Sequence, residues 1–296
     1  MTTFAIAALQ LALDQKDNCA EIADEVRRLK RRFPWVRMAL VGELAAYGAN
    51  IDLAQPLPGP AEAFFCALAR ETGLWLLPGS LYERRGDAVF NTTPVIDPAG
   101  DVVARYSKMY PFAPYERGVT PGAECVAFDV PGAGRFGVSI CYDMWFGETT
   151  RTLAWMGAEV VLHPSMTNTI DRDVEVCMAR AGAAANQCYF FDVNVAGALG
   201  NGRSVIAGPG GEVIHQAGEG REIMPVEVDF AYVRRVRERG WHGLGQPLKS
   251  FRDGARAFAP YQASNRSESL DAFGPLLKPG ETPDLPGKVE QLRKKT

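Results

Sequence analysis

Short apolar runs alternate with amphipathic segments along the first 240 residues of the chain. Runs of about four to eight apolar residues predict buried strands, and apolar positions repeated every three or four residues predict helices. We expect strands at residues 4–11, 37–41, 74–80, 89–96, 102–106, 125–130, 135–140, 159–163, 188–195, 204–206, 212–216 and 223–228. We expect helices at residues 18–32, 60–72, 148–156, 174–186 and 230–239. This alternation predicts an α/β fold with mixed strand directions.

Turn signals and a change of pattern indicate how the chain is organised. The segments 97–100, 131–134 and 208–211 combine proline with glycine between apolar runs, which predicts three hairpins. Beyond about residue 240 prolines interrupt the periodicity. We therefore expect a domain at residues 1–240 and a C-terminal arm at 241–296 that packs on the domain or on a partner subunit.

Composition narrows the class of protein. Hydrophobic residues make up 47% and charged residues 23% of the 296 residues, which is typical of a globular protein. A net charge of -3 gives no electrostatic reason to expect nucleic acid or a membrane as a partner. No apolar run approaches the roughly 20 residues of a membrane span, and the N-terminus has no basic leader.

The six cysteines are expected to be free thiols. The six cysteines form no CxxC pair, so neither a zinc site nor a disulfide framework is expected. Free thiols in a reducing cytoplasm are the simplest interpretation. The chain also lacks a glycine-rich dinucleotide loop after its first strand. We expect no metal and no cofactor.

Three chemically active residues end or follow apolar runs. Cys141 ends the run 136–141, and Glu43 and Lys108 come shortly after the predicted strands 37–41 and 102–106. Each residue alone has an ordinary structural explanation. Together they supply a nucleophile, a proton carrier and a cation, which suits acyl transfer from a carbon–nitrogen bond. None of the three histidines is well placed to serve as the base, so a carboxylate and an amine must activate the thiol.

The segments around these residues resemble the three signature blocks of the nitrilase superfamily of carbon–nitrogen hydrolases. The blocks are Gly42-Glu43-Leu44, Tyr106-Ser-Lys108-Met-Tyr-Pro111 and Ile140-Cys141-Tyr142-Asp143. They occur in the family's order, and the resemblance covers roughly residues 4–230. It implies an αββα sandwich, and a homodimer with four αββααββα layers or a larger homo-oligomer.

The resemblance also implies roles for individual residues. Glu43 is expected to be the general base and then the acid, and Cys141 the nucleophile that forms a thioester. Lys108 is expected to stabilise the oxyanion, helped by the backbone N–H of Tyr142. Glu116 is similar to the fourth polar residue of amidase-type members, which positions the substrate and tunes Lys108. Asp143 is expected to cap the helix that follows.

The sequence after the nucleophile bears on the substrate. True nitrilases usually carry Trp-Glu there, whereas Tyr142-Asp143 is similar to the amidase and carbamoylase branches. We therefore predict hydrolysis of a small amide to a carboxylate and ammonia. Trp145 stands where omega-amidase-like members carry an arginine, which favours a neutral, fairly apolar amide. The residues expected to wall the substrate pocket are Tyr47, Tyr115, Tyr142, Trp145, Phe146 and Met166.

Three alternatives stay open at this point. An N-carbamoyl amide hydrolase needs an anchor for a carboxylate, for which Arg172, Arg180 and Arg203 are candidates. A nitrilase is less favoured. A third alternative is a non-catalytic binding member of the superfamily. The intact set of Glu43, Lys108 and Cys141 argues against it.

Overall fold

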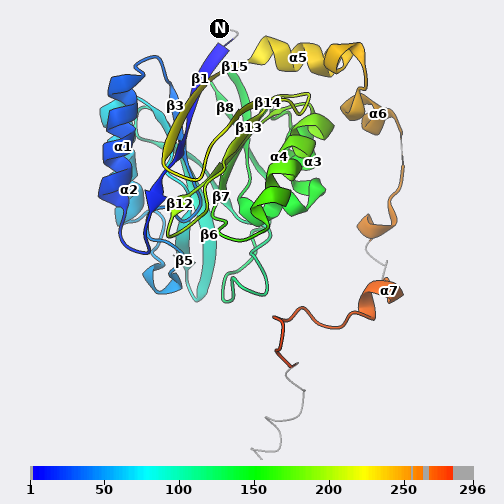
Figure 1. Ribbon diagram of the computed structural model, residues 1–296, viewed down its shortest axis with the longest axis horizontal. Coiled ribbons are helices and arrows are strands. Elements are labelled where there is room, and N and C mark those ends of the chain that lie inside the picture. The colour runs from blue at the N-terminus through cyan, green and yellow to red at the C-terminus, as the bar shows by residue number, and fades with distance from the viewer. Residues whose placement is uncertain (1–2, 255, 263–266, 283–296) are drawn as a thin grey trace, which may run out of the picture.

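Two β-sheets face each other, and helices cover the outer face of each (Figure 1). The computed structural model describes residues 3–254, 256–262 and 267–282. The first sheet has the strand order β15-β1-β3-β4-β6-β5, with β7 also paired to β6. Its strands are β1 (Thr3–Gln10), β3 (Met38–Val41), β4 (Trp75–Leu77), β5 (Leu81–Arg85), β6 (Ala88–Ile96), β7 (Val102–Ser107) and β15 (Glu222–Asp229).

The second sheet has the order β14-β13-β11-β10-β9-β8. Its strands are β8 (Val126–Val130), β9 (Gly134–Val138), β10 (Val160–Ser165), β11 (Tyr189–Asn194), β13 (Val205–Ala207) and β14 (Val213–Gln216). Strand directions are mixed, because β9, β10 and β11 run parallel whereas β8 and β13 pair antiparallel to their neighbours. A short parallel pair, β2 (Ala12–Leu13) with β12 (Ala196–Gly197), joins the two halves of the chain.

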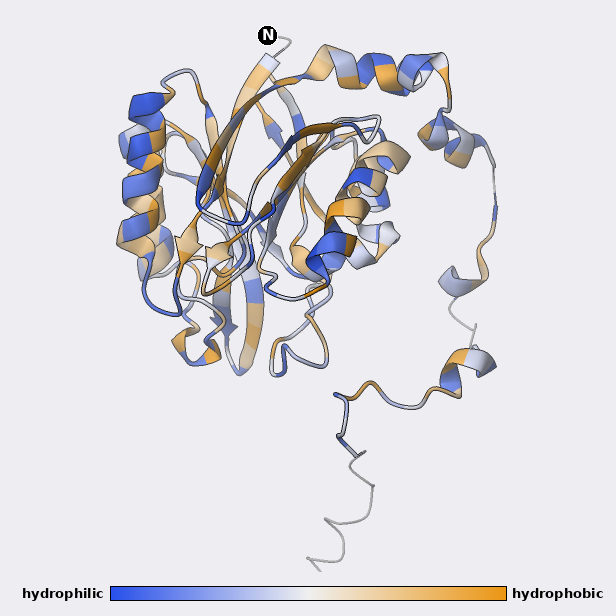
Figure 2. Ribbon diagram, viewed as in Figure 1, coloured by the Kyte–Doolittle hydropathy of each residue, from blue (hydrophilic) through white to orange (hydrophobic). Residues whose placement is uncertain are grey.

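Alternation along the strands builds the core between the sheets. In β1, Phe4 and Ile6 belong to the buried cluster between the sheets, whereas Ala7 and Leu9 belong to the cluster under the outer helices. Successive side chains of a strand point to opposite faces, so a strand that is apolar at every position is covered on both sides. Figure 2 shows this as hydrophobic colour along the strands and mixed colour on the outer helices.

The outer helices are amphipathic. The first sheet is covered by α1 (Cys19–Arg32) and α2 (Pro60–Thr72), and the second by α3 (Gly147–Trp155) and α4 (Arg172–Asn186) (Figure 1). In α4 the buried residues Val176, Ala179 and Ala183 recur every three or four positions and pack against β10, β11 and β13.

The structure confirms the predicted αββα sandwich and all three hairpins, which are β6–β7, β8–β9 and β13–β14. Strand β5 was not predicted, because Leu81–Arg85 has a charged second half and no continuous apolar run. The predicted four-layer dimer stays a prediction. Among the described residues, no helix combines the length and the apolar character that crossing a membrane requires.

The segment after the last strand runs along the α3 and α4 side of the sandwich (Figure 1). It contains α5 (Phe230–Arg239), η3 (Trp241–Gly243), α6 (Pro247–Gly254), η4 (Ala259–Tyr261) and α7 (Glu268–Asp271). Its described part contacts the sandwich, since the Tyr261 hydroxyl donates to Glu148 at 2.7 Å and Glu281 pairs with Arg117. Residues 283–296 of the predicted arm lie outside the described residues.

Replacing Phe136 with alanine is expected to lower the free energy of unfolding by about 3–5 kcal/mol. Phe136 is fully buried between the sheets and contacts the rings of Phe4, Phe128 and Phe230, so its removal leaves a cavity. Urea unfolding followed by circular dichroism measures the loss. The control is Val103→Ala, at a position 45% exposed on β7, where a change of about 0.5 kcal/mol or less is expected. Equal losses in both variants would contradict the proposed core.

Candidate active site

Loops at the ends of strands from both sheets bring the predicted residues together. Glu43 lies two residues after β3, Lys108 directly follows β7, and Cys141 lies three residues after β9. The backbone N–H of Glu43 donates to the carbonyl of Ser165 at the end of β10, which ties the two sheets together here. At Gly42 a side chain would come within 2.7 Å of Val195, so this close approach requires glycine.

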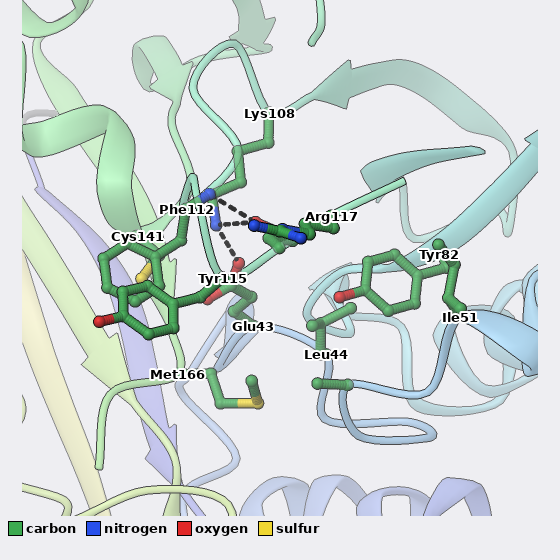
Figure 3. A pocket seen from close by; sticks show the side chains of 12 residues that line it. Glu43, Leu44, Ile51, Tyr82, Lys108, Phe112, Tyr115, Arg117, Cys141 and Met166 are labelled. Atoms are coloured by element: carbon green, nitrogen blue, oxygen red, sulfur yellow. Dashed lines mark hydrogen bonds and ion pairs between the residues drawn. The ribbon is translucent and has the colours of Figure 1, made fainter. Parts of the chain in front are cut away.

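The ammonium of Lys108 lies between two carboxylates. Its Nζ donates to Oε1 of Glu43 at 2.8 Å and to Oε2 of Glu116 at 2.9 Å (Figure 3). The side-chain amide of Asn91 on β6 also donates to both carboxylates, at 2.8 and 2.9 Å. The Lys108 and Glu43 side chains are each 2% exposed, so water does not screen these interactions.

The surroundings shift the pKa values of the two carboxylates in opposite directions. Burial and the charge of Glu116 raise the pKa of Glu43, although the charge of Lys108 opposes the rise. Burial also acts to raise the pKa of Glu116, but Lys108 and the backbone N–H of Phe112 outweigh it and lower the pKa overall. Burial acts to lower the pKa of Lys108, yet the nearby carboxylates hold it well above its usual range. Glu116 is thus the fixed anion, and Glu43 is the group able to gain and lose a proton.

Cys141 sits at a sharp turn. It begins the short helix η2 (Cys141–Trp145) with φ of 45°, a region that residues other than glycine seldom adopt. Burial and the negative charge of Glu43 raise the pKa of its thiol well above the usual value, whereas Lys108 lowers it. The thiol is therefore protonated at neutral pH until a base accepts its proton. Glu43 and Cys141 lie within hydrogen-bond reach of each other. This hydrogen bond acts to lower the pKa of the Glu43 carboxyl, against the larger effect of burial.

Asp143 stabilises this turn and does not cap the following helix. Its carboxylate accepts from the backbone N–H of Ile140 at 2.8 Å, the Tyr106 hydroxyl at 2.6 Å and the backbone N–H of Tyr110 at 2.9 Å. The N-cap of α3 is Phe146. The predicted capping role is therefore wrong, because η2 separates Asp143 from the helix.

A cavity of about 290 Å³ opens beside these groups (Figure 3). It is lined by Glu43, Leu44, Ala49, Ile51, Tyr82, Lys108, Phe112, Tyr115, Glu116, Arg117, Cys141 and Met166. Such a volume is at the small end of ligand pockets. A thiol, an ammonium and two carboxylates at one wall, with apolar side chains opposite, suit a small substrate that has one reactive polar group.

The predicted pocket residues fall into two groups. Tyr115 and Met166 line the cavity. The other four do not line it. Tyr47 packs beside the cluster under the outer helices, and Tyr142, Trp145 and Phe146 form an aromatic group in which the Tyr142 ring lies 6.0 Å from Trp145 and 5.4 Å from Phe146.

The arginines proposed as carboxylate anchors lie elsewhere. Arg172 is buried in ion pairs with Glu175 and Asp192, Arg180 donates to a backbone carbonyl, and Arg203 pairs with Asp173. The arginine that lines the cavity is Arg117.

Sequence reasoning missed Asn91 and Arg117. For Asn91 a signal existed, since the polar run 91–93 interrupts an apolar strand at three buried positions. For Arg117 none existed, because its place depends on the loop that follows Lys108.

His163 is buried near the site. Burial lowers the pKa of His163 to about 4, so this fully buried imidazole is neutral at physiological pH; its Nδ1 lies 2.7 Å from the Ser139 hydroxyl. In the part of the chain that the structure describes, no three metal-ligating side chains gather in one place. The expected absence of a cofactor stays a prediction.

Comparison with known proteins places this arrangement in a family. The model of the carbon-nitrogen hydrolase family matches residues 4–238. The chain is 28% identical over 257 residues to the deaminated glutathione amidase of Homo sapiens, covering 79% of this chain and 78% of the relative. It is 25% identical over 258 residues to the omega-amidase NIT2 of Homo sapiens, covering 81% and 93%.

A solved structure agrees. Saccharomyces cerevisiae Nit3, a member of branch 10 of the nitrilase superfamily, superposes with a TM-score of 0.74 at 25% identity, covering 80% of this chain and 94% of Nit3. The fold and the polar groups at its strand ends define a hydrolase of the αββα sandwich class. The chain belongs to the carbon–nitrogen hydrolase family. The predicted membership of the amidase-like branch of the nitrilase superfamily is confirmed.

Replacing Asn91 with alanine is expected to raise the pKa of both Glu43 and Glu116. Asn91 donates to the ionised form of each carboxylate, and such a bond to a charged group contributes about 1.5–3 kcal/mol. Carbon NMR titration of the glutamate side chains measures the shift, and the acid limb of the pH–activity profile should move to higher pH. The control is Asn186→Ala, which loses the hydrogen bond from the Asn186 side-chain amide to the Gly182 carbonyl near the end of α4. An acid limb that stays in place in Asn91→Ala would contradict this role.

Proposed function

We propose that this chain hydrolyses the carbon–nitrogen bond of a small amide, with Cys141 as the nucleophile and Glu43, Lys108 and Glu116 as its catalytic partners. The observation that carries the proposal is the buried Lys108 ammonium held between two carboxylates at the wall of a cavity that also contains the thiol. Amide hydrolysis is the activity named for both human relatives, which supports the choice of bond.

In the first half of the reaction the thiol attacks the amide carbon. Its proton passes to Glu43 as the sulfur–carbon bond forms, because the thiol is not ionised at rest. Negative charge develops on the amide oxygen, and the Lys108 ammonium stabilises it. Glu43 then donates the proton to the nitrogen, the carbon–nitrogen bond breaks, and ammonia leaves behind a thioester on Cys141.

In the second half water releases the product. Glu43, ionised again, accepts a proton from water while the water oxygen attacks the thioester carbon. The carbon–sulfur bond breaks, the thiol regains a proton from Glu43, and the carboxylic acid leaves. Glu116 stays ionised throughout, keeps Lys108 charged and accepts from the substrate NH2 group. A carboxylate whose pKa is raised, as in Glu43, suits proton transfer. A carboxylate whose pKa is lowered, as in Glu116, suits a group that stays charged.

The cavity lining supports a small, neutral, fairly apolar amide. Leu44, Ile51 and Met166 face the polar wall, and the rings of Phe112 and Tyr115 stack with centroids 5.1 Å apart at one side. Burying apolar substrate surface against these groups supplies binding free energy without demanding a second polar group.

Replacing Cys141 with alanine is expected to abolish ammonia release, because no other group in the cavity can form the thioester. The measurement is ammonia released from short amides, aromatic amides, carbamoyl amino acids and nitriles. Cys177→Ala, at an exposed thiol on α4, is the matched control and should keep wild-type activity. Full activity in Cys141→Ala, or no release from any amide by the folded wild type, would refute the proposed function.

Arg117 supports a second candidate, an N-carbamoyl amide hydrolase that releases carbon dioxide and ammonia. Carbamoyl amino acids carry a carboxylate, and the Arg117 guanidinium lines the cavity, where it can bind that group. In the structure Arg117 pairs with Glu281 of the C-terminal segment, and Lys278 lies 5.2 Å from the ring of neighbouring Tyr115. A substrate carboxylate would replace Glu281 as the partner of Arg117.

Replacing Arg117 with alanine separates the two candidates. If carboxylate-bearing substrates are preferred, KM for them should rise at least about tenfold, since a charge-assisted hydrogen bond is lost. KM for neutral amides should stay unchanged. Steady-state kinetics on a matched pair, a carbamoyl amino acid and its methyl ester, gives the measurement. Equal KM values for the pair in wild type and variant would exclude a carboxylate anchor at Arg117.

Three further features belong to the proposal. A homodimer is supported by apolar side chains exposed on and beside α3 and α4, such as Trp155, Ile170 and Val174. A cytoplasmic location is supported by six free cysteines. The proposed packing of the arm at 241–296 on the domain at 1–240 is supported by the ion pair of Glu281 with Arg117, a residue that lines the cavity.

A further inference from the structure

A buried cluster of charges lies behind the nucleophile, on the side of the second sheet. Arg172, the first residue of α4, donates to Glu175 at 3.1 Å and to Asp192 on β11 at 2.5 Å. Asp192 also accepts from the Ser165 hydroxyl at 2.8 Å. Each of these side chains is at most 5% exposed. One guanidinium and two carboxylates leave the ionised cluster with one negative charge.

Thr167 connects this cluster to Cys141. Its Oγ1 lies 3.9 Å from the Cys141 Sγ and donates to Oε1 of Glu175 at 3.0 Å. Its backbone is fixed as well, because the side-chain amide of Asn194 accepts from the Thr167 N–H at 2.8 Å and donates to the Thr167 carbonyl at 2.9 Å. Thr167 is not among the residues that line the cavity. It therefore contacts the nucleophile without contacting the space for the substrate.

The direction of these hydrogen bonds has a chemical consequence. A threonine hydroxyl has one proton, and here Glu175 accepts it. Only lone pairs of Oγ1 then face the sulfur, so in this contact the Cys141 S–H is the donor and Thr167 is a second acceptor for it beside the Glu43 carboxylate. A thiolate at this position would face the oxygen lone pairs, with the Glu175 carboxylate one hydrogen bond further away. The contact thus favours the thiol over the thiolate.

We propose that Thr167, fixed by the Arg172–Glu175–Asp192 cluster, is a positioning residue that holds Cys141 as a neutral thiol by presenting only a hydrogen-bond acceptor to the sulfur. The proposal rests on the proposed function of Cys141 as nucleophile. It gives the cluster a role in that site: the thiol is protected from electrophiles at rest, and it loses its proton to Glu43 only while the sulfur attacks the substrate.

Other charged groups also face the thiol. Glu43 and Lys108 approach from the first sheet, Glu175 from α4, and His163 from β10 is neutral. Glu175 raises the pKa of the thiol, in the same direction as Glu43 and against Lys108. A variant that changes Glu175 alone leaves the pair of Glu43 and Lys108 intact, which isolates the contribution of the cluster.

Glu175→Gln tests the proposal. Glutamine removes the negative charge, and its amide can donate to Thr167 Oγ1, which frees the threonine proton to donate to sulfur. The thiolate is then favoured, so Cys141 should react about tenfold faster at pH 7, the factor expected for a pKa lowered by about one unit. The readout is the rate of Cys141 modification by methyl methanethiosulfonate between pH 6 and 10, resolved from the other cysteines by peptide mass spectrometry.

Controls separate this effect from a structural one. Glu62→Gln alters another buried carboxylate, paired with Arg105 on the far sheet, and should leave the Cys141 rate unchanged. In the double variant T167V/E175Q the acceleration should be smaller than in Glu175→Gln, because the hydroxyl that donates to sulfur is absent. A Cys141 rate in folded Glu175→Gln equal to or below that of wild type overturns the proposal.

A second readout does not depend on Glu175→Gln folding. The S–H stretching band of Cys141, identified by its loss in Cys141→Ala, should lie at the lower frequency of a hydrogen-bonded thiol. It should move to higher frequency in Thr167→Val and stay in place in Thr167→Ser, which keeps the hydroxyl. A band that is absent from wild type, or unmoved in Thr167→Val, overturns the proposal. Neither readout requires turnover, so failure here is distinguishable from failure of the amide-hydrolysis assay.

Discussion

The site depends on one buried cation. Lys108 is 2% exposed and is compensated by Glu43 and Glu116, and Asn91 supports both carboxylates. A lone ammonium in such a place would be expensive, and removing one partner of a buried pair costs about 3–5 kcal/mol. The same arrangement pushes the pKa values of the two carboxylates apart. The buried Lys108 ammonium therefore accounts both for the stability of the site and for the different proton chemistry of Glu43 and Glu116.

The αββα sandwich is what makes that arrangement possible. Glu43 and Lys108 follow strands of the first sheet, whereas Cys141 follows β9 of the second. Packing the sheets face to face brings these strand ends to one rim, and hydrogen bonds such as that from Glu43 N–H to Ser165 fix their separation. Such a rim, held by rigid strands, positions reactive groups more firmly than a mobile loop does.

The nucleophile lies between two negative regions of different character. On the first-sheet side Glu43 is paired with Lys108, and on the second-sheet side Glu175 is paired with Arg172. Burial, Glu43 and Glu175 disfavour a free thiolate and Lys108 only partly offsets them, so the thiol has to be deprotonated during attack. The family model that matches residues 4–238 shows the family, while Arg117 lines the cavity and the Arg172–Glu175–Asp192 cluster lies behind the nucleophile.

The amino-acid sequence determined the layers and the reactive set, because strand and helix periodicities are local and Cys141, Glu43 and Lys108 stand in recognisable blocks. It could not determine the cavity wall. Tyr142 and Trp145 lie within four residues of the nucleophile in sequence, yet they do not line the cavity, because the η2 turn directs the chain away from it. Arg117 and Asn91 reach the site through long-range packing. Which side chains face one space depends on contacts between distant segments, and only the tertiary structure decides those.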